Sequence, residues 1–218
     1  MISNLASYLD LANHHADATP EQIKSLCQNV LKYKFNAAFV NPVYVLLAKR
    51  YLPQAHVGTV ISFPLGQDAL YIKLAAVKLA ATAGADELDI SANIALFKTA
   101  SWDQATQEMN QLTTAAKTIT PQIIVKFIIE TGYLTPNEIK RAALTVLQSG
   151  ADFVKTCSGM GPRGATLEDV KLIRQAVGSQ IKIKVAGGIA THAQALAFIQ
   201  AGADRIGTSK AVEIVLGE

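Results

Sequence analysis

Short apolar runs alternate with helix-period segments from one end of the chain to the other. The apolar runs are rich in β-branched residues, which favours buried strands. The segments between them repeat apolar residues with the helical period, which predicts helices with one apolar face. The expected strands are 8–13, 37–40, 57–61, 87–90, 123–129, 153–155, a run ending at Lys184, and 204–207. The expected helices are 20–33, 42–51, 69–82, 102–116, 136–148, 167–177, 192–200 and 209–215.

Local signals mark the ends of these elements. Thr19 followed by Pro20 is a typical helix start, and a Gly-Ala-Asp turn precedes a strand at 84–86, 150–152 and 202–204. Eight strand–helix units in one chain predict an α/β protein, a (β/α)8 TIM barrel forming a single domain over residues 1–218. The alternative is an open doubly wound sheet, which commonly has about five or six strands.

Composition narrows the class of protein. Half of the 218 residues are apolar, 17% are charged and 6% are aromatic, which predicts a compact domain packed mainly by aliphatic side chains. A net charge of +3 is too small to indicate a nucleic-acid or membrane partner. The two isolated cysteines, the lack of a long apolar tract and the lack of a leader segment predict a cytoplasmic protein with free thiols.

Two lysines end neighbouring predicted strands. Lys155 follows Phe153-Val154, and Lys184 stands in the same position one strand–helix unit later. If the strands are parallel neighbours, both ammonium groups arrive at the same end of the barrel, on strands about 5 Å apart. Active sites of (β/α)8 barrels lie at this end. The pair is therefore the predicted active site.

Other charged side chains share the inward face of the strands with the lysine pair. Strand side chains alternate, so if Asp89 and Lys184 point inward, Glu87, Lys126 and Lys182 tend to do so too. Buried charges without partners are prohibitive. We therefore expect a Glu87–Lys126 ion pair, with Lys182 reaching solvent at the bottom of the barrel.

The lysine pair allows two interpretations. It could be a buried ion pair with Asp89 that only supports the structure. Alternatively, the cation of Lys184 and partial burial keep Lys155 uncharged near neutral pH, and a neutral amine attacks an aldehyde to form an imine. Asp89 would then act as general acid–base through a water.

A second group of residues predicts a phosphate seat. Gly187-Gly188 follows the seventh strand and Gly207-Thr208-Ser209 the eighth, and barrels often bind phosphate at these loops. Ser158-Gly159, in the loop after the sixth strand, could form a third side of this phosphate site. The alternative is that the glycines only form turns and Ser209 only caps a helix. Thr156 and Asp10, at the ends of their strands, complete the expected substrate-binding set.

Two further features have simple explanations. His14, His15 and Asp17 form a cluster without a spaced third or fourth ligand, so we expect no metal there. Cys157 is expected to be a small buried side chain facing away from the site.

Taken together, these stretches resemble 2-deoxyribose-5-phosphate aldolases, which are class I aldolases on a (β/α)8 barrel. The segments that carry the resemblance span nearly the whole chain in order; they are 40–42, 63–66, 84–89, 126–135, 150–156, 164–170, 184–189 and 205–209. The resemblance implies Lys155 as the Schiff-base residue and places Asp89 and Lys184 on proton-transfer positions. It also implies that Gly187, Gly188 and Ser209 bind phosphate.

The implied activity is cleavage of 2-deoxy-D-ribose 5-phosphate to acetaldehyde and D-glyceraldehyde 3-phosphate in nucleotide catabolism, with no cofactor. A homodimer is expected, since barrels commonly associate through their outer helices. The chain departs from the family pattern at Ala12, where a substrate-contacting hydroxyl is usual, and at His15, Phe39 and Cys157-Ser158. Two alternatives remain open: a Schiff-base aldolase for another phosphorylated sugar, and a barrel that binds sugar phosphate without turnover.

Overall fold

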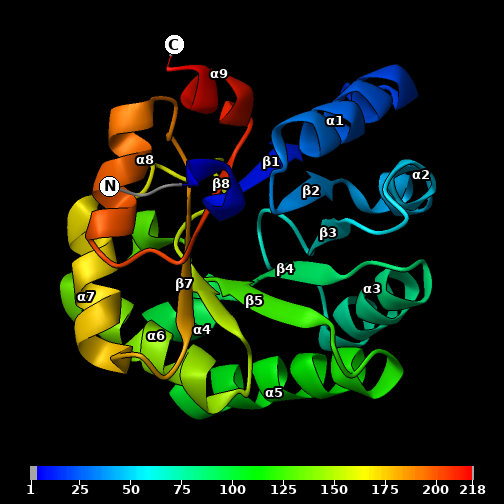
Figure 1. The fold of residues 1–218 in the computed structure, drawn as a ribbon. Helices are drawn as coiled ribbons and strands as arrows, with labels where there is room; N and C mark the ends of the chain where they lie inside the picture. Colours follow the sequence, from blue (N-terminus) through cyan, green and yellow to red (C-terminus); the bar gives the residue numbers. More distant parts are fainter. Residues whose placement is uncertain (1–3, 218) are drawn as a thin grey trace.

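The computed structural model describes residues 4–217, which form a closed barrel of parallel strands surrounded by helices (Figure 1). Each strand pairs with its neighbour in sequence, and β1 closes the barrel against β8. The strands are β1 (Leu9–Asn13), β2 (Ala37–Val40), β3 (His56–Ile61), β4 (Glu87–Ser91), β5 (Ile124–Ile128), β6 (Phe153–Lys155), β7 (Lys182–Ala186) and β8 (Arg205–Thr208). The predicted (β/α)8 barrel is confirmed, and the open sheet is excluded.

The helices cover the outside of the barrel, and four of them begin with a reciprocal capping box. In each box a threonine side chain accepts a hydrogen bond from the third helical residue, whose side chain in turn accepts one from the threonine N–H. The α-helices are α1 (Pro20–Tyr33), α2 (Val45–Tyr51), α3 (Leu70–Thr82), α4 (Ile94–Lys98), α5 (Trp102–Ile119), α6 (Pro136–Gln148), α7 (Leu167–Val177), α8 (His192–Gln200) and α9 (Ala211–Leu216). Short 3-10 turns are η1 (Leu5–Tyr8), η2 (Pro42–Tyr44) and η3 (Thr131–Tyr133).

Several element ends differ from the sequence prediction by one to three residues, and three differences matter for the argument. β7 continues past Lys184 to Ala186, because its outward residues still pack against the helices. The last helix begins at Ala211, so Ser209 is not its N-cap. The short helix α4 was missed, since five residues are too few to show a helical period.

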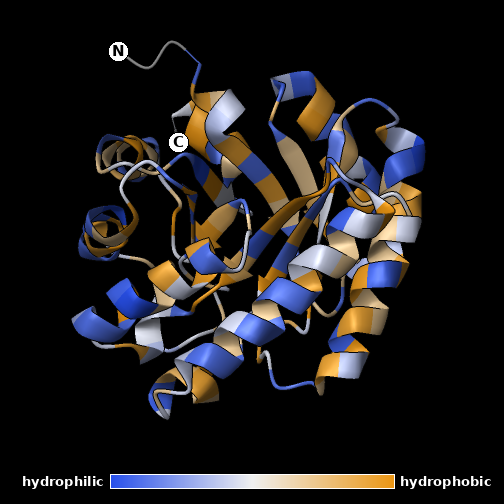
Figure 2. Cartoon of the chain, turned by 90° about the horizontal axis from the view of Figure 1, so that it is seen from below, coloured by the Kyte–Doolittle hydropathy of each residue, from blue (hydrophilic) through white to orange (hydrophobic). Residues whose placement is uncertain are grey.

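Apolar side chains gather between the strands and the helices. Leu88, Ile90, Val125, Ile183 and Val185 are fully buried there. The helices carry both hydrophilic and hydrophobic stretches along their length, as expected when one face packs on the barrel (Figure 2). Within the described part of the chain, no helix combines the length and apolarity that a membrane crossing requires.

The three Gly-Ala-Asp turns do more than end a helix. The carboxylates of Asp86, Asp152 and Asp204 each accept a hydrogen bond, 2.8 Å long, from the backbone N–H of the second residue of the preceding strand of the barrel. Each also pairs with a cation from an outer helix: Lys49, Lys117 and Arg174, respectively. The repeated turn therefore ties neighbouring strands and helices together at the amino end of the barrel.

Candidate active site

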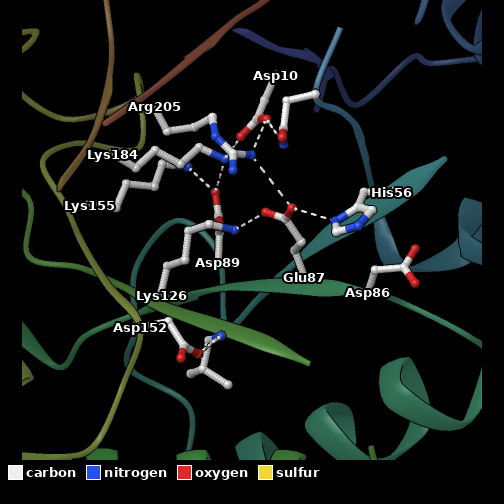
Figure 3. A network of polar contacts seen from close by, with 12 residues as sticks. Asp10, His56, Asp86, Glu87, Asp89, Lys126, Asp152, Lys155, Lys184 and Arg205 are labelled. Atoms are coloured by element: carbon white, nitrogen blue, oxygen red, sulfur yellow. Dashed lines mark hydrogen bonds and ion pairs between the residues drawn. The ribbon is translucent and has the colours of Figure 1, made fainter. Parts of the chain in front are cut away.

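Lys155 and Lys184 lie side by side at the carboxyl end of the barrel, because they are register partners on β6 and β7. Both are almost completely buried. The Nζ atoms of both lysines lie 2.8 Å from the same oxygen, Oδ2 of Asp89 on β4 (Figure 3). The structure thus brings together the three residues expected to be catalytic, with one carboxylate between two amines.

The predicted Glu87–Lys126 ion pair is confirmed beneath them. Lys126 on β5 donates to Oε2 of Glu87, and its Nζ lies 3.1 Å from Oδ1 of Asp89. All three side chains are fully buried. Lys182, in contrast, is exposed at the start of β7, as expected.

Asp10 on β1 belongs to the same network, although no cluster around it was expected. Its Oδ2 lies 2.7 Å from Nζ of Lys184, and its Oδ1 accepts a hydrogen bond from Arg205 at 2.9 Å. Arg205 was not singled out from the sequence. The available signal was its position at the start of a strand, on the same face as Gly207.

The charges in this network shift one another's titration. Burial raises the pKa of Asp89, but Lys126, Lys155 and Lys184 outweigh it and hold that pKa well below its usual range. Burial lowers the pKa of Lys184, and Lys126 and Lys155 act in the same direction against Asp10 and Asp89. Asp89 is therefore an anion, while Lys184 gives up its proton more readily than an ordinary lysine.

Aromatic rings and glycines shape the space around Lys184. Its Nζ lies 3.3 Å from the ring centroid of Phe39, which is itself buried. Phe39 fits because Gly58 faces it: a Cβ on Gly58 would lie 2.2 Å from the ring. Similarly, a Cβ on Gly207 would lie 3.0 Å from Cε of Lys184. Gly207 therefore makes room for a lysine, whatever its part in phosphate binding.

A cavity of about 310 Å³ opens above the lysine pair. Lys155, Lys184 and Asp89 form its floor, and Ala12 lies in its wall, so this wall position carries no hydroxyl. Six of the residues expected to bind substrate or phosphate line it: Gly187, Gly188, Gly207, Ser209, Ser158 and Gly159.

The backbone of the expected phosphate seat requires its glycines. Gly187 and Gly188 both have positive φ, 96° and 80°. A Cβ on Gly187 would also lie 3.2 Å from Cβ of Cys157. Thr208 ties the two loops together, since its hydroxyl donates to the Ile189 carbonyl and accepts the Lys210 N–H.

Two of the expected substrate-binding residues do not line this cavity. Thr156 is fully buried, and its hydroxyl bonds to the backbone of Ala186, joining β6 to β7. Asp10 lies behind Lys184 and Arg205. Cys157 is buried outside the cavity, with Sγ 3.2 Å from the Thr131 hydroxyl, and burial raises the pKa of its thiol.

His14 lines the cavity, which the sequence did not indicate. Its ring packs against Phe63, and its Nδ1 is buried without a hydrogen-bond partner among the described residues. Burial, followed by the charge of Lys155, lowers the pKa of His14 to about 3, so the imidazole is neutral at physiological pH. Across residues 4–217, no group of three or more His, Cys, Asp or Glu side chains is arranged to hold a metal ion.

Comparison with known proteins agrees with this geometry. The model of the DeoC/LacD family aldolases matches residues 5–210. A curated deoxyribose-phosphate aldolase from Thermococcus gammatolerans is 44% identical over 218 residues, covering 98% of this chain and 96% of that relative.

Two solved aldolase structures also resemble this chain over nearly its whole length. An aldolase called QR15 superposes with a TM-score of 0.93 at 36% identity, covering 99% of this chain and 96% of that one. The deoxyribose phosphate aldolase of Aeropyrum pernix, described as a tetramer, gives a TM-score of 0.90 at 29% identity, covering 97% of this chain and 89% of the other. The family match spans almost the whole chain and includes both strands that carry the lysine pair, and the chain therefore belongs to the DeoC/LacD family of aldolases.

Proposed function

We propose that this aldolase reversibly cleaves 2-deoxy-D-ribose 5-phosphate to acetaldehyde and D-glyceraldehyde 3-phosphate through a Schiff base on Lys155. The observation that carries the proposal is the shared contact of Lys155 and Lys184 with one oxygen of Asp89, on the floor of a cavity. Two cations sharing one carboxylate favour loss of a proton from one of them. A neutral amine is the form that can attack an aldehyde.

The proposed reaction begins with attack of Lys155 Nζ on C1, and loss of water leaves an iminium. Asp89, acting through a water, removes the C3 hydroxyl proton while the C2–C3 bond breaks and its electrons pass to the iminium. This step releases D-glyceraldehyde 3-phosphate. The enamine left on Lys155 is protonated at C2 and hydrolysed to acetaldehyde, which frees the amine. Lys184 remains beside Asp89 and takes up or returns the proton that the two lysines share.

The phosphate group would lie at the loops after β7 and β8. Gly187, Gly188 and Ser209 line the cavity there, and Ser158 and Gly159 face them from the loop after β6. Because Ser209 precedes the first turn of α9 rather than capping it, its hydroxyl is free of a capping role. Lys210 also lines the cavity, and its ammonium group pairs with Glu213 at 2.8 Å.

Borohydride reduction in the presence of acetaldehyde tests the proposal. The wild type should gain a two-carbon adduct on Lys155, and Lys155→Leu should gain none and lose at least about 10⁴-fold in kcat. Lys182→Leu is the matched control, because Lys182 is an exposed lysine at the opposite end of the barrel. An adduct on another lysine, or normal turnover by Lys155→Leu, would contradict the proposal.

We also propose a homodimer that buries the outer face of α3. Lys78 is the one exposed charge on this helix, whereas Tyr71 and Leu79 are each 72% exposed. A helix whose outer face is mostly apolar is normally covered. Light scattering should give twice the chain mass for the wild type and a monomer for Tyr71→Glu combined with Leu79→Glu. A monomeric wild type would rule the dimer out.

A further inference from the structure

A continuous chain of charged side chains runs through the barrel from its amino end to the lysine pair (Figure 3). It starts at His56, the first residue of β3, whose side chain is half exposed. Nδ1 of His56 lies 3.0 Å from Oε1 of Glu87, whose other oxygen binds Lys126. Lys126 contacts one oxygen of Asp89, and the other oxygen contacts Lys155 and Lys184.

Cations outnumber anions among these charged side chains. Its ion pairs join four cationic side chains, Lys126, Lys155, Lys184 and Arg205, to three carboxylates, Asp10, Glu87 and Asp89. All lie inside the barrel, and only Arg205 has a side chain more than a few per cent exposed. A surplus cation in such a place is costly, and losing one lysine proton removes it. Burial raises the pKa of Asp10, which can only enlarge the surplus.

We propose that Glu87, Lys126 and His56 are positioning residues that set, through the net charge of the barrel interior, the pH at which the lysine pair releases its shared proton. This inference rests on the proposed Schiff-base function. None of the three residues lines the cavity above the lysine pair. They act on the lysines through Asp89, through Arg205 and Asp10, and through the field of their own charges.

The titratable groups around Glu87, Lys126 and His56 are members of the charged network or lie next to it. Glu87 faces Lys126, His56, Arg205 and Lys184, which together lower its pKa although burial acts against them. Lys126 faces Asp89, Glu87 and Asp10, which raise its pKa although burial lowers it. The hydrogen bond to Glu87 raises the pKa of His56, with Asp86 adding to it, and burial and Arg205 opposing it. At the upper end, the groups around the lysine pair are Asp89, Asp10 and neutral His14.

Two single substitutions should shift the reaction in opposite directions. Glu87→Gln removes a negative charge and enlarges the cationic surplus, so the lysine pair loses its proton more easily. The acid limb of the kcat/KM profile should then move down by about 1 pH unit. Lys126→Met removes the surplus, so the same limb should move up by a similar amount. Glu168→Gln and Lys171→Met, the same changes on the exposed face of α7, should leave the limb in place.

Two further variants test the inference if one of the single variants does not fold. One is the double variant, and the other changes His56, at the exposed end of the row of charged side chains. Glu87→Gln combined with Lys126→Met restores the surplus of one cation, so its acid limb should return to the wild-type position. His56→Gln removes a group that adds a cation when protonated, so the limb should rise by a few tenths of a pH unit. His192→Gln, on the exposed side of α8, is its control.

Each profile is measured twice, by cleavage of deoxyribose 5-phosphate and by the pH dependence of the borohydride-trapped acetaldehyde adduct. Limbs that move in the same direction in both single variants, or a double variant that stays shifted, would overturn the inference. So would a His56→Gln profile identical to that of His192→Gln. If Lys155→Leu still forms the adduct, the proposed function itself fails; if it does not and the limbs stay in place, only this inference fails.

Discussion

The two faces of strands β4 and β7 differ sharply in chemistry. Along β4, Leu88 and Ile90 point outward into the apolar layer under the helices, while Glu87 and Asp89 point inward to the charged network. The same alternation holds along β7, with Ile183 and Val185 outside and Lys184 inside. The apolar layer supplies burial and stabilises the fold. The interior, which would normally be packed with branched aliphatic residues, instead holds charges that the proposed chemistry needs.

The expectation of a core packed mainly by aliphatic side chains is confirmed. Aliphatic side chains do fill the layer between strands and helices, but the centre of the barrel holds ion pairs and the rings of Phe39 and Phe153. A buried ion pair contributes little net stability, since desolvation offsets most of the attraction. The charged interior therefore stabilises the fold little, and most of the stability must come from the apolar outer layer. Substitutions of two adjacent residues on one strand, one facing inward and one facing outward, should therefore separate catalysis from stability.

The largest effect is expected from Asp89→Asn. This change keeps the shape of the side chain but removes the proton acceptor, so kcat for cleavage should fall by about 10² to 10⁴-fold. Borohydride should still trap acetaldehyde on Lys155, which shows that the barrel is folded and the amine is accessible. A variant that retains most of the wild-type kcat would remove Asp89 from the mechanism.

The neighbouring substitution Leu88→Ala should do the opposite. It leaves a hole in the outer layer and should lower the free energy of unfolding by about 2–5 kcal/mol. Leu88 is fully buried and faces away from the network, so kcat below the unfolding transition should stay near that of the wild type. Urea unfolding and steady-state kinetics on the same sample check both parts. A loss of kcat without a loss of stability would contradict the division of roles.

His14, which lines the cavity, makes the free energy of unfolding depend on pH. Because its folded-state pKa is about 3, below the usual 6.5, folding opposes its protonation, and the protein should lose stability as pH falls through this range. Between pH 7 and pH 4 the loss should be about 3 kcal/mol, and His14→Leu should lack this part of it. Urea unfolding of both proteins at the two pH values measures the difference. Equal losses in the two proteins would mean that His14 does not titrate as stated.

The smallest effect is expected at the amino end of the barrel. Asp152→Ala removes a charged acceptor from the Val125 N–H and the partner of Lys117. The contact is partly exposed, so the free energy of unfolding should fall by about 1–2 kcal/mol, with no change in the acid limb of kcat/KM. Thermal unfolding and the pH profile check the two statements. A shifted limb would show that the amino-end contacts reach the lysine pair.

Much of the fold follows from local pattern. The bounds of α1, α6, α7 and α8 agree with the prediction, because a threonine cap and an apolar stripe mark each of them. The Glu87–Lys126 pair followed from strand alternation and from the cost of an unpaired buried charge. His14 could not be predicted in this way, since its packing and its neutral state depend on Phe63 in the loop after β3 and on Lys155 of β6, both distant in the sequence. Thr156 was misplaced because its hydroxyl serves the pairing of β6 with β7.

The number and order of the strand–helix units can be derived from the amino-acid pattern, and so can the arrival of Lys155 and Lys184 at one end of neighbouring strands. Both depend on periodicity and spacing, which are local properties of the chain. The meeting of Asp10 and Arg205 beside Lys184, in contrast, joins residues 195 positions apart and depends on the folded barrel. Closure of the barrel brings β1 against β8, and no local pattern encodes which side chains then share the interior.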